Sequence, residues 1–323
     1  MIGKIIAAAR STPVRIAVAA CGVAGVILIL RGLGWDKVSG ALAGAALYLP
    51  VILALDGLGL ACSMMALRAL YGDAARDLPP SALVRAGLVG FAVNGLLPAG
   101  RAVAEATRAS LLAKYVGKGT AAAAAARMQG VVMVAHGVMS IVATIAAVAA
   151  VGFTWLPLAI GINAVVVLAI GTVVLFATSR SRIGAWIGRR FARAQQFGSE
   201  LDAAFARQPG IPMGAIGWEL AGRVIEVGQK AVLIAAIGGV VGIIPALTVE
   251  GIHLLGAAIG DLVPAQLGVQ EGNFTLASSA IGLPASGAVS IALLAHLSQL
   301  AWVLVGSLLP LVWRVRSEVK VTT

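Results

Sequence analysis

Apolar stretches long enough to cross a membrane recur along almost the whole chain, and this feature constrains the fold most. A helix needs about 20 mostly apolar residues to cross the hydrocarbon core of a bilayer. The sequence predicts such spans at residues 14–30, 38–67, 121–151, 155–177, 216–240 and 289–313, the second of them long and broken by Pro50. Only 11% of the residues are charged, against about 25% in soluble domains. We therefore expect an all-α polytopic membrane protein, a helical bundle with residues 1–323 as a single integral membrane domain.

Two further apolar regions, residues 82–117 and 248–282, are interrupted by prolines and polar side chains. The first contains LPAGRAVAE (residues 97–105) and the second VPAQLGVQE (residues 263–271). Three pairs recur at one offset of 166 residues, namely Pro98 with Pro264, Val103 with Val269 and Glu105 with Glu271. Two spans lie between the copies, so the second copy runs through the membrane in the opposite direction. The pattern predicts two broken or re-entrant helix elements in an inverted repeat, over residues 38–139 and 203–305, as in secondary transporters.

Lysine and arginine are concentrated in alternate connections between the spans. They are frequent before residue 16, around residues 68–85 and 108–127, in residues 179–208 and after residue 313, whereas residues 152–155 and 241–287 have none. Basic connections stay on the cytoplasmic side. We therefore expect both termini in the cytoplasm and a location in the bacterial inner membrane. Attraction of these basic connections to anionic lipid headgroups at the cytoplasmic surface explains the net charge of +11. A nucleic-acid partner is therefore not expected.

Residues 179–208 are too polar to cross the membrane. Apolar side chains alternate there with basic ones, at Ile183, Trp186, Ile187, Phe191 and Phe197. This pattern favours an amphipathic linker helix on the cytoplasmic membrane surface, and a solvated linker helix is the alternative.

Three carboxylates fall within the two interrupted regions, at Glu105, Asp261 and Glu271. A charge at the bilayer centre costs at least about 2.5 kcal/mol on insertion scales, so it needs a partner or a function. We expect the three to face a shared polar interior. The alternative places them at the membrane surface, where they cap short helices.

The span at residues 216–240 carries alternating charges at Glu219, Arg223, Glu226 and Lys230. The spacing of i, i+4, i+7 and i+11 puts them on one narrow face of a helix, and this face cannot meet lipid. We expect two i,i+4 ion pairs, Glu219 with Arg223 and Glu226 with Lys230. They either hold the bundle together or contact substrate. Further interior partners are expected at Asp56, His136, His253 and His296.

The sequence lacks a convincing catalytic constellation. The three histidines are far apart in sequence and form no metal-ligand cluster, so neither a metal nor another cofactor is expected. Acidic residues at Asp56 and at Asp73–Asp77 resemble a CDP-alcohol phosphotransferase signature, but the spacing differs. We expect a protein that is not an enzyme, with a membrane-embedded lipid-modifying transferase as an alternative.

Two segments resemble signatures of a known family. NGLLPAGRAVAEATRASLL (residues 94–112), and DLVPAQLGVQEGNF (residues 261–274) followed by GL (282–283), are similar to the lysylphosphatidylglycerol synthase transmembrane region, and most to its flippase-like, hopanoid-associated HpnL-type branch. The resemblance covers residues 38–313 and implies a bundle with two broken helices. It further implies that the protein moves an aminoacyl-phospholipid-like or hopanoid-related lipid across the inner membrane. One departure is that His296 and Gln299 stand where many relatives carry an arginine pair.

The resemblance also identifies positions that match the family motifs. These are Asn94, Pro98, Glu105, Arg108, Pro264, Gly268, Glu271 and Gly272. Together with the residue patterns, they predict a substrate pathway of Asn94, Pro98, Arg101, Glu105, Arg108, Glu219, Arg223, Glu226, Lys230, Asp261, Pro264, Gln266, Gly268, Gln270, Glu271, His296 and Gln299. Membrane lipids are the expected partners. A non-transporting membrane partner of lipid-biosynthesis enzymes is the other alternative.

Overall fold

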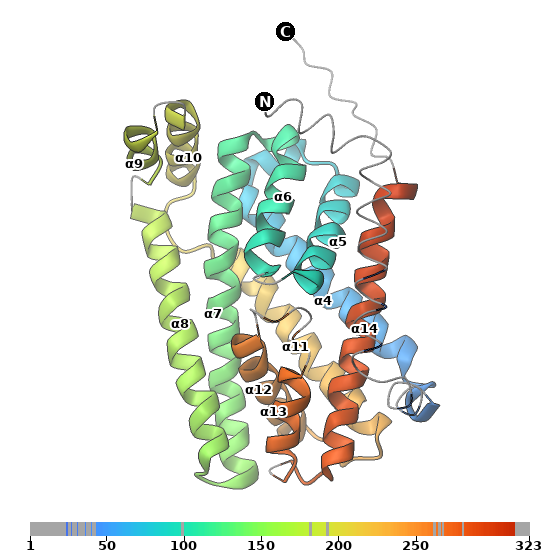
Figure 1. Ribbon diagram of the computed structural model, residues 1–323. Helices are drawn as coiled ribbons and strands as arrows, with labels where there is room; N and C mark the ends of the chain where they lie inside the picture. Colours follow the sequence, from blue (N-terminus) through green and yellow to red (C-terminus); the bar gives the residue numbers. More distant parts are fainter. Residues whose placement is uncertain are drawn as a thin grey trace.

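The chain folds into an α-helical bundle (Figure 1). The computed structural model describes residues 43–97, 100–180, 183–191, 194–260, 263, 266, 268–279 and 281–313, with isolated positions at 24, 27, 31, 36 and 40. Within these ranges there is no strand. The helices are α4 (Leu49–Tyr71), η1 (Gly72–Asp77), α5 (Pro80–Leu96), α6 (Gly100–Val116), α7 (Lys118–Val151), α8 (Trp155–Arg180), α9 (Ile183–Arg190), α10 (Gln195–Arg207), α11 (Met213–Ala236), α12 (Ile243–Gly260), α13 (Val269–Ala277) and α14 (Ala285–Val312).

Five helical segments of the described chain are long and apolar enough to cross a membrane. They are Leu49–Asp77, Lys118–Val151, Trp155–Arg180, Ile243–Gly260 and Ala285–Val312. Helix α11 is 24 residues long and carries the charged side chains of the predicted stripe. The expected all-α polytopic membrane fold is therefore confirmed. The predicted span at residues 14–30 and both chain termini lie outside the described residues.

Pro50 stands at the break that the sequence predicts in the span at residues 38–67. Residues 43–45 are helical, residues 46–48 form a turn, and α4 begins at Leu49 with Pro50 in its first turn. The first backbone N–H groups of a helix have no partner within it, so a proline costs little at this position.

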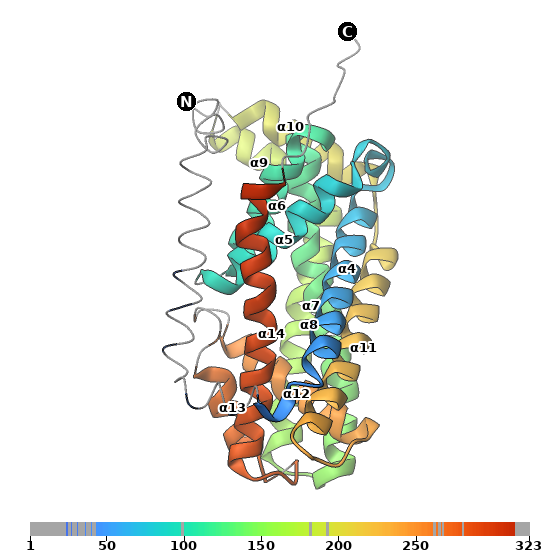
Figure 2. The ribbon, with the colours of Figure 1, turned by 90° about the vertical axis from the view of Figure 1, so that its right-hand side faces the viewer.

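The two interrupted regions form two helix pairs at opposite ends of the bundle (Figures 1 and 2). Helix α5 ends at Leu96 and α6 begins at Gly100, while α12 ends at Gly260 and α13 begins at Val269. The α5–α6 pair enters and leaves from the end that holds α9 and α10. The α12–α13 pair enters and leaves from the end that holds the α7–α8 turn. The prolines Pro98 and Pro264 and the carboxylate Asp261 lie outside the described residues, and the relation of the pairs as an inverted repeat stays a prediction.

The polar segment at residues 179–208 forms two short helices instead of the single linker helix that we expected. Helices α9 and α10 pack so closely that a Cβ built on Gly184 would lie 1.9 Å from the carbonyl oxygen of Gly198. Asp202 of α10 accepts hydrogen bonds from the backbone N–H groups of Gly184 and Ala185, at 2.7 and 2.8 Å. This carboxylate accepts hydrogen bonds from backbone N–H groups in the first turn of α9. These groups have no partner within the helix itself.

Candidate functional site

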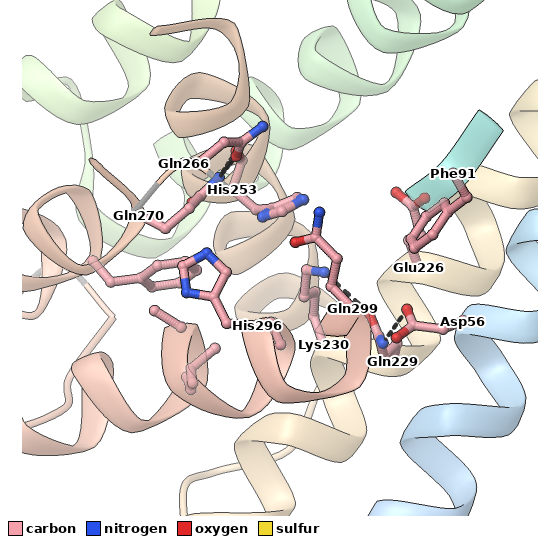
Figure 3. A pocket seen from close by; sticks show the side chains of 14 residues that line it. Asp56, Phe91, Glu226, Gln229, Lys230, His253, Gln266, Gln270, His296 and Gln299 are labelled. Carbon is pink, nitrogen blue, oxygen red and sulfur yellow. Dashed lines mark hydrogen bonds between the residues drawn. The ribbon is translucent and has the colours of Figure 1, made fainter. Parts of the chain in front are cut away.

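Two adjoining cavities lie inside the bundle. The larger has a volume of about 240 Å³ and the smaller about 130 Å³. Six residues line both, which makes the cavities neighbours, and Figure 3 shows them around the smaller one: Asp56, Phe91, Glu226, His253, Gln266 and Gln299. The walls come from α4, α5, α6, α7, α11, α12, α13 and α14, so both interrupted regions contribute.

Most of the residues predicted for the substrate pathway line these two cavities. The larger cavity is lined by Asn94, Arg101, Glu105, Arg108, Glu219 and Arg223, the smaller by Lys230, Gln270 and His296, and both by Glu226, Gln266 and Gln299. Gly268 and Glu271 stand at the start of α13 and line neither cavity. Pro98, Asp261 and Pro264 lie outside the described residues.

Helix α6 presents an ion pair to the larger cavity. The Arg108 guanidinium donates a hydrogen bond to Glu105, and the two side chains are 12% and 7% exposed. The second carboxylate oxygen of Glu105 has no hydrogen-bond partner among the described residues. Arg101, one turn before, acts on Glu105 electrostatically. A carboxylate with one paired and one unpaired oxygen retains the capacity to accept a further hydrogen bond.

The charged stripe of α11 pairs differently from the i,i+4 expectation. Arg223 donates a hydrogen bond to Glu226 at 2.6 Å and lies 4.0 Å from Glu250 of α12. Lys230 lies 3.5 Å from the other oxygen of Glu250. The expected pairs within α11, from Glu219 to Arg223 and from Glu226 to Lys230, are therefore replaced in the described structure by one i,i+3 pair and by contacts to a second helix. A carboxylate on the facing helix is nearer than the intrahelical partner that spacing alone selects.

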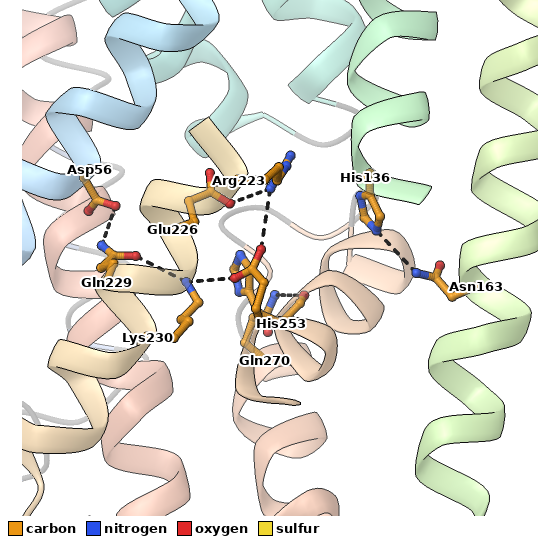
Figure 4. Close-up of polar contacts among 10 residues, drawn as sticks. Asp56, His136, Asn163, Arg223, Glu226, Gln229, Lys230, His253 and Gln270 are labelled. Atoms are coloured by element: carbon orange, nitrogen blue, oxygen red, sulfur yellow. Dashed lines mark hydrogen bonds and ion pairs between the residues drawn. The ribbon is translucent and has the colours of Figure 1, made fainter. Parts of the chain in front are cut away.

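Glu250 is the partner that the sequence patterns did not identify. Its side chain is fully buried, and neither oxygen has a hydrogen bond among the described residues. Two cations of α11 compensate it, as Figure 4 shows. The sequence does contain a signal for an interior role of Glu250. It is the single acidic residue of the apolar span Ile243–Gly260, where a carboxylate needs a partner.

A hydrogen-bonded chain extends this network to α4 and α14. Lys230 donates to the side-chain oxygen of Gln229 at 3.2 Å, and Gln229 donates to Asp56 (Figure 4). Ser298 of α14 also donates to Asp56. Four helices, α4, α11, α12 and α14, are thus tied through polar side chains beside the cavities, which satisfies groups that lipid could not satisfy.

Helix α13 is held on both sides by polar contacts. Glu271 accepts a hydrogen bond from the backbone N–H of Gly268 at 2.8 Å, and its other oxygen lies 2.8 Å from Nδ1 of His296 on α14. Gln270 donates to Gln266 at 2.6 Å and to the carbonyl of His253 at 3.3 Å. The Asn273 amide donates to the carbonyl of Ile252. Glu271 therefore has a structural role at the start of α13, in addition to any effect on the neighbouring cavity.

The chemistry of the site is ion pairing and hydrogen bonding. Among the described residues, no group of three or more His, Cys, Asp or Glu side chains lies close enough to hold a metal ion. His136 pairs instead with Asn163 of α8 at 3.3 Å (Figure 4).

The sequence profile of one protein family, described as "Lysylphosphatidylglycerol synthase TM region", matches residues 14–306. The chain belongs to this family. Comparison with curated proteins and with solved structures gave no match.

Membership of the lysylphosphatidylglycerol synthase TM region family makes this a multi-pass membrane protein related to lipid synthesis or flipping. Asn94, Glu105 and Arg108, which were singled out by resemblance to the family motifs, line the larger cavity. The structure adds lining residues that sequence reasoning missed, notably Phe91, Gln229 and Trp302. An aromatic side chain in a membrane helix, such as Phe91 or Trp302, gives no local signal that it faces a cavity.

Proposed function

We propose that this protein is a flippase that moves an amphipathic lipid across the bacterial inner membrane. The observation that carries the proposal is the pair of adjoining cavities, lined by charged and polar side chains inside a membrane bundle. A headgroup would cross through this polar interior while the acyl chains stay in the bilayer, because only the headgroup needs hydrogen-bonding partners at membrane depth.

The two helix pairs support a transport cycle. We infer that α5–α6 and α12–α13 are re-entrant elements related by an axis in the membrane plane, so that rocking of one repeat against the other alternates access to the cavities. Superposing residues 38–139 on residues 203–305 of an experimental structure is expected to bring Pro98 onto Pro264. Two elements related by an axis along the membrane normal would contradict the inverted repeat.

The orientation in the membrane and the class of lipid are part of the same proposal. We place both termini in the cytoplasm, because lysine and arginine are concentrated in alternate connections of the sequence. The basic start of α7 and end of α9 lie at the end of the bundle that holds α9 and α10, which supports a cytoplasmic side there. The family resemblance favours an aminoacyl-phospholipid-like or hopanoid-related lipid and the HpnL-type branch. No cofactor and no catalytic residue is assigned.

Reconstitution tests the proposal. The purified protein is placed in lipid vesicles with a fluorescently labelled lipid in both leaflets, and a membrane-impermeant quencher then reports the lipid that reaches the outer leaflet. Transport above the rate of protein-free vesicles is expected. A protein that moves no lipid but co-purifies with lipid-biosynthesis enzymes would be a non-transporting partner, and chemical change of the lipid would indicate a transferase.

A further inference from the structure

The charges that line the two cavities balance. Four carboxylates, Asp56, Glu105, Glu219 and Glu226, stand beside four cationic side chains, Arg101, Arg108, Arg223 and Lys230. An excess of one sign would raise the local concentration of headgroups of the opposite sign. The balanced lining offers no such selection by net charge.

The charged side chains already have partners inside the protein. Arg108 pairs with Glu105, Arg223 with Glu226, and Lys230 with the buried Glu250. Asp56 accepts hydrogen bonds from Gln229 and Ser298, and Glu219 interacts electrostatically with Arg223. Arg101 interacts with Glu105. A phosphate or ammonium that entered would have to displace one of these partners or stay unpaired in a low-dielectric site, and both are costly.

The remaining hydrogen-bonding capacity is neutral or mixed. Within the described part of the chain, the side-chain amides of Asn94 and Gln299 have no hydrogen-bond partner, and both line the larger cavity. Figure 3 shows Gln299 between His253 and the Asp56 end of the smaller cavity. Unpaired atoms of cavity-lining residues include acceptors, on Glu105 and Glu219, and a donor, Nε of Arg108. A phosphate only accepts and an ammonium only donates, but a hydroxyl does both.

Two aromatic side chains complete the wall. Phe91 and Trp302 line the larger cavity, and the indole N–H of Trp302 donates to the carbonyl of Leu53 at 3.2 Å. With its N–H satisfied, the indole offers the cavity apolar surface that packs against C–H groups. A sugar or polyol presents C–H groups and hydroxyls together.

We propose that the joined cavities bind the headgroup of a neutral, hydroxyl-bearing lipid, with Asn94 and Gln299 as its hydrogen-bonding partners. This inference rests on the proposed function for its biological role, because it names the class of lipid that the flippase moves. Lipids with a sugar or polyol headgroup are preferred over anionic, zwitterionic and cationic phospholipids. Of the lipids that the family resemblance favours, this inference excludes the charged, aminoacyl-phospholipid-like class.

Lipid binding to the purified protein in detergent tests the headgroup class without requiring transport. Intact-complex mass spectrometry compares four lipids with the same acyl chains: glucosyl diacylglycerol, phosphatidylglycerol, phosphatidylethanolamine and lysylphosphatidylglycerol. We expect the neutral glycolipid to bind about tenfold more tightly than the others, equal to about 1.4 kcal/mol. Equal or tighter binding of a charged lipid overturns the inference.

Substitutions locate the binding to the cavities. Gln299→Leu and Asn94→Leu are each expected to weaken glycolipid binding about tenfold and to leave binding of the three phospholipids unchanged. Gln196→Leu on the exposed surface of α10 is the matched control and is expected to bind like the wild type. Asn94 is exposed to the cavity, so Asn94→Leu tests the inference even where Gln299→Leu fails to fold. If folded Asn94→Leu binds the glycolipid as tightly as the wild type, Asn94 is not a partner of the headgroup and the inference is overturned.

A transport arm separates the two proposals. The same labelled lipids are measured in phosphatidylcholine vesicles. A glycolipid preference in binding without movement of any lipid overturns the flippase assignment and supports the headgroup inference. Movement of charged lipids at least as fast as the glycolipid supports the flippase and overturns the headgroup inference.

Discussion

Lys230 of α11 and Glu250 of α12 form an ion pair across the helix interface, with 3.5 Å between Nζ and a carboxylate oxygen and with side chains that are 3% and 0% exposed. Breaking a buried pair by removing one partner costs about 3–5 kcal/mol, whereas replacing both partners by apolar side chains is often neutral. Among the described residues, Arg223 is the cation that remains near Glu250 when Lys230 is lost, at 4.0 Å.

The first prediction concerns this pair. Lys230→Met is expected to lower the free energy of unfolding by about 3–5 kcal/mol, because it leaves Glu250 buried with a distant cation. The double variant Lys230→Met with Glu250→Leu is expected to recover at least half of the loss. Unfolding in detergent, followed by tryptophan fluorescence, measures both. Losses that simply add in the double variant would show that the two residues act independently.

The second prediction concerns the repeated glutamates. Glu105→Gln and Glu271→Gln are each expected to leave folding and membrane insertion largely intact but to slow lipid movement. The glutamine keeps a hydrogen-bond acceptor for Arg108 or for Gly268 and removes the charge. Vesicle transport is measured beside thermal stability. Wild-type rates in both variants would leave the acidic motif with a structural role only.

The third prediction concerns topology. Ser199 lies on α10, which we place on the cytoplasmic side. In a background with Cys21 and Cys62 replaced by alanine, Ser199→Cys is expected to react with an impermeant thiol reagent in inside-out membrane vesicles and not in intact cells. Reaction in intact cells alone would reverse the orientation.

The fourth prediction concerns close packing of α14 on α5. A Cβ built on Gly306 would lie 2.1 Å from the backbone oxygen of Leu88, so Gly306→Ala forces the helices apart. We expect destabilisation by about 1–3 kcal/mol. Gly228→Ala in α11 is the control, because its Cβ meets nothing within 4 Å. The control is expected to be neutral or up to about 1 kcal/mol stabilising, since alanine favours a helix. Equal thermal shifts in the two variants would show that the contact at Gly306 is not tight.

The sequence predicted the helices well where length and hydropathy are the physical cause. The α7 and α8 spans were located within a few residues, and the breaks around residues 98 and 264 separate helices as expected. The break expected at Pro50 is also present, as a turn at residues 46–48 followed by α4, because a proline is tolerated in the first turn of a helix and not in its interior. The composition of the polar segment after α8 did not predict its fold. The close contact between Gly184 and Gly198 and the hydrogen bonds to Asp202 make it a helical hairpin.

What the sequence by itself determined is the membrane class, the polar face of α11 and the charged residues that line the cavities, because apolar length and helical spacing are local properties. Tertiary structure alone decided the pairing with Glu250. Lys230 and Arg223 meet Glu250 because α11 and α12 are in register, and that register depends on packing along the whole interface. Local spacing selects partners within one helix, whereas the nearest buried carboxylate here lies on another.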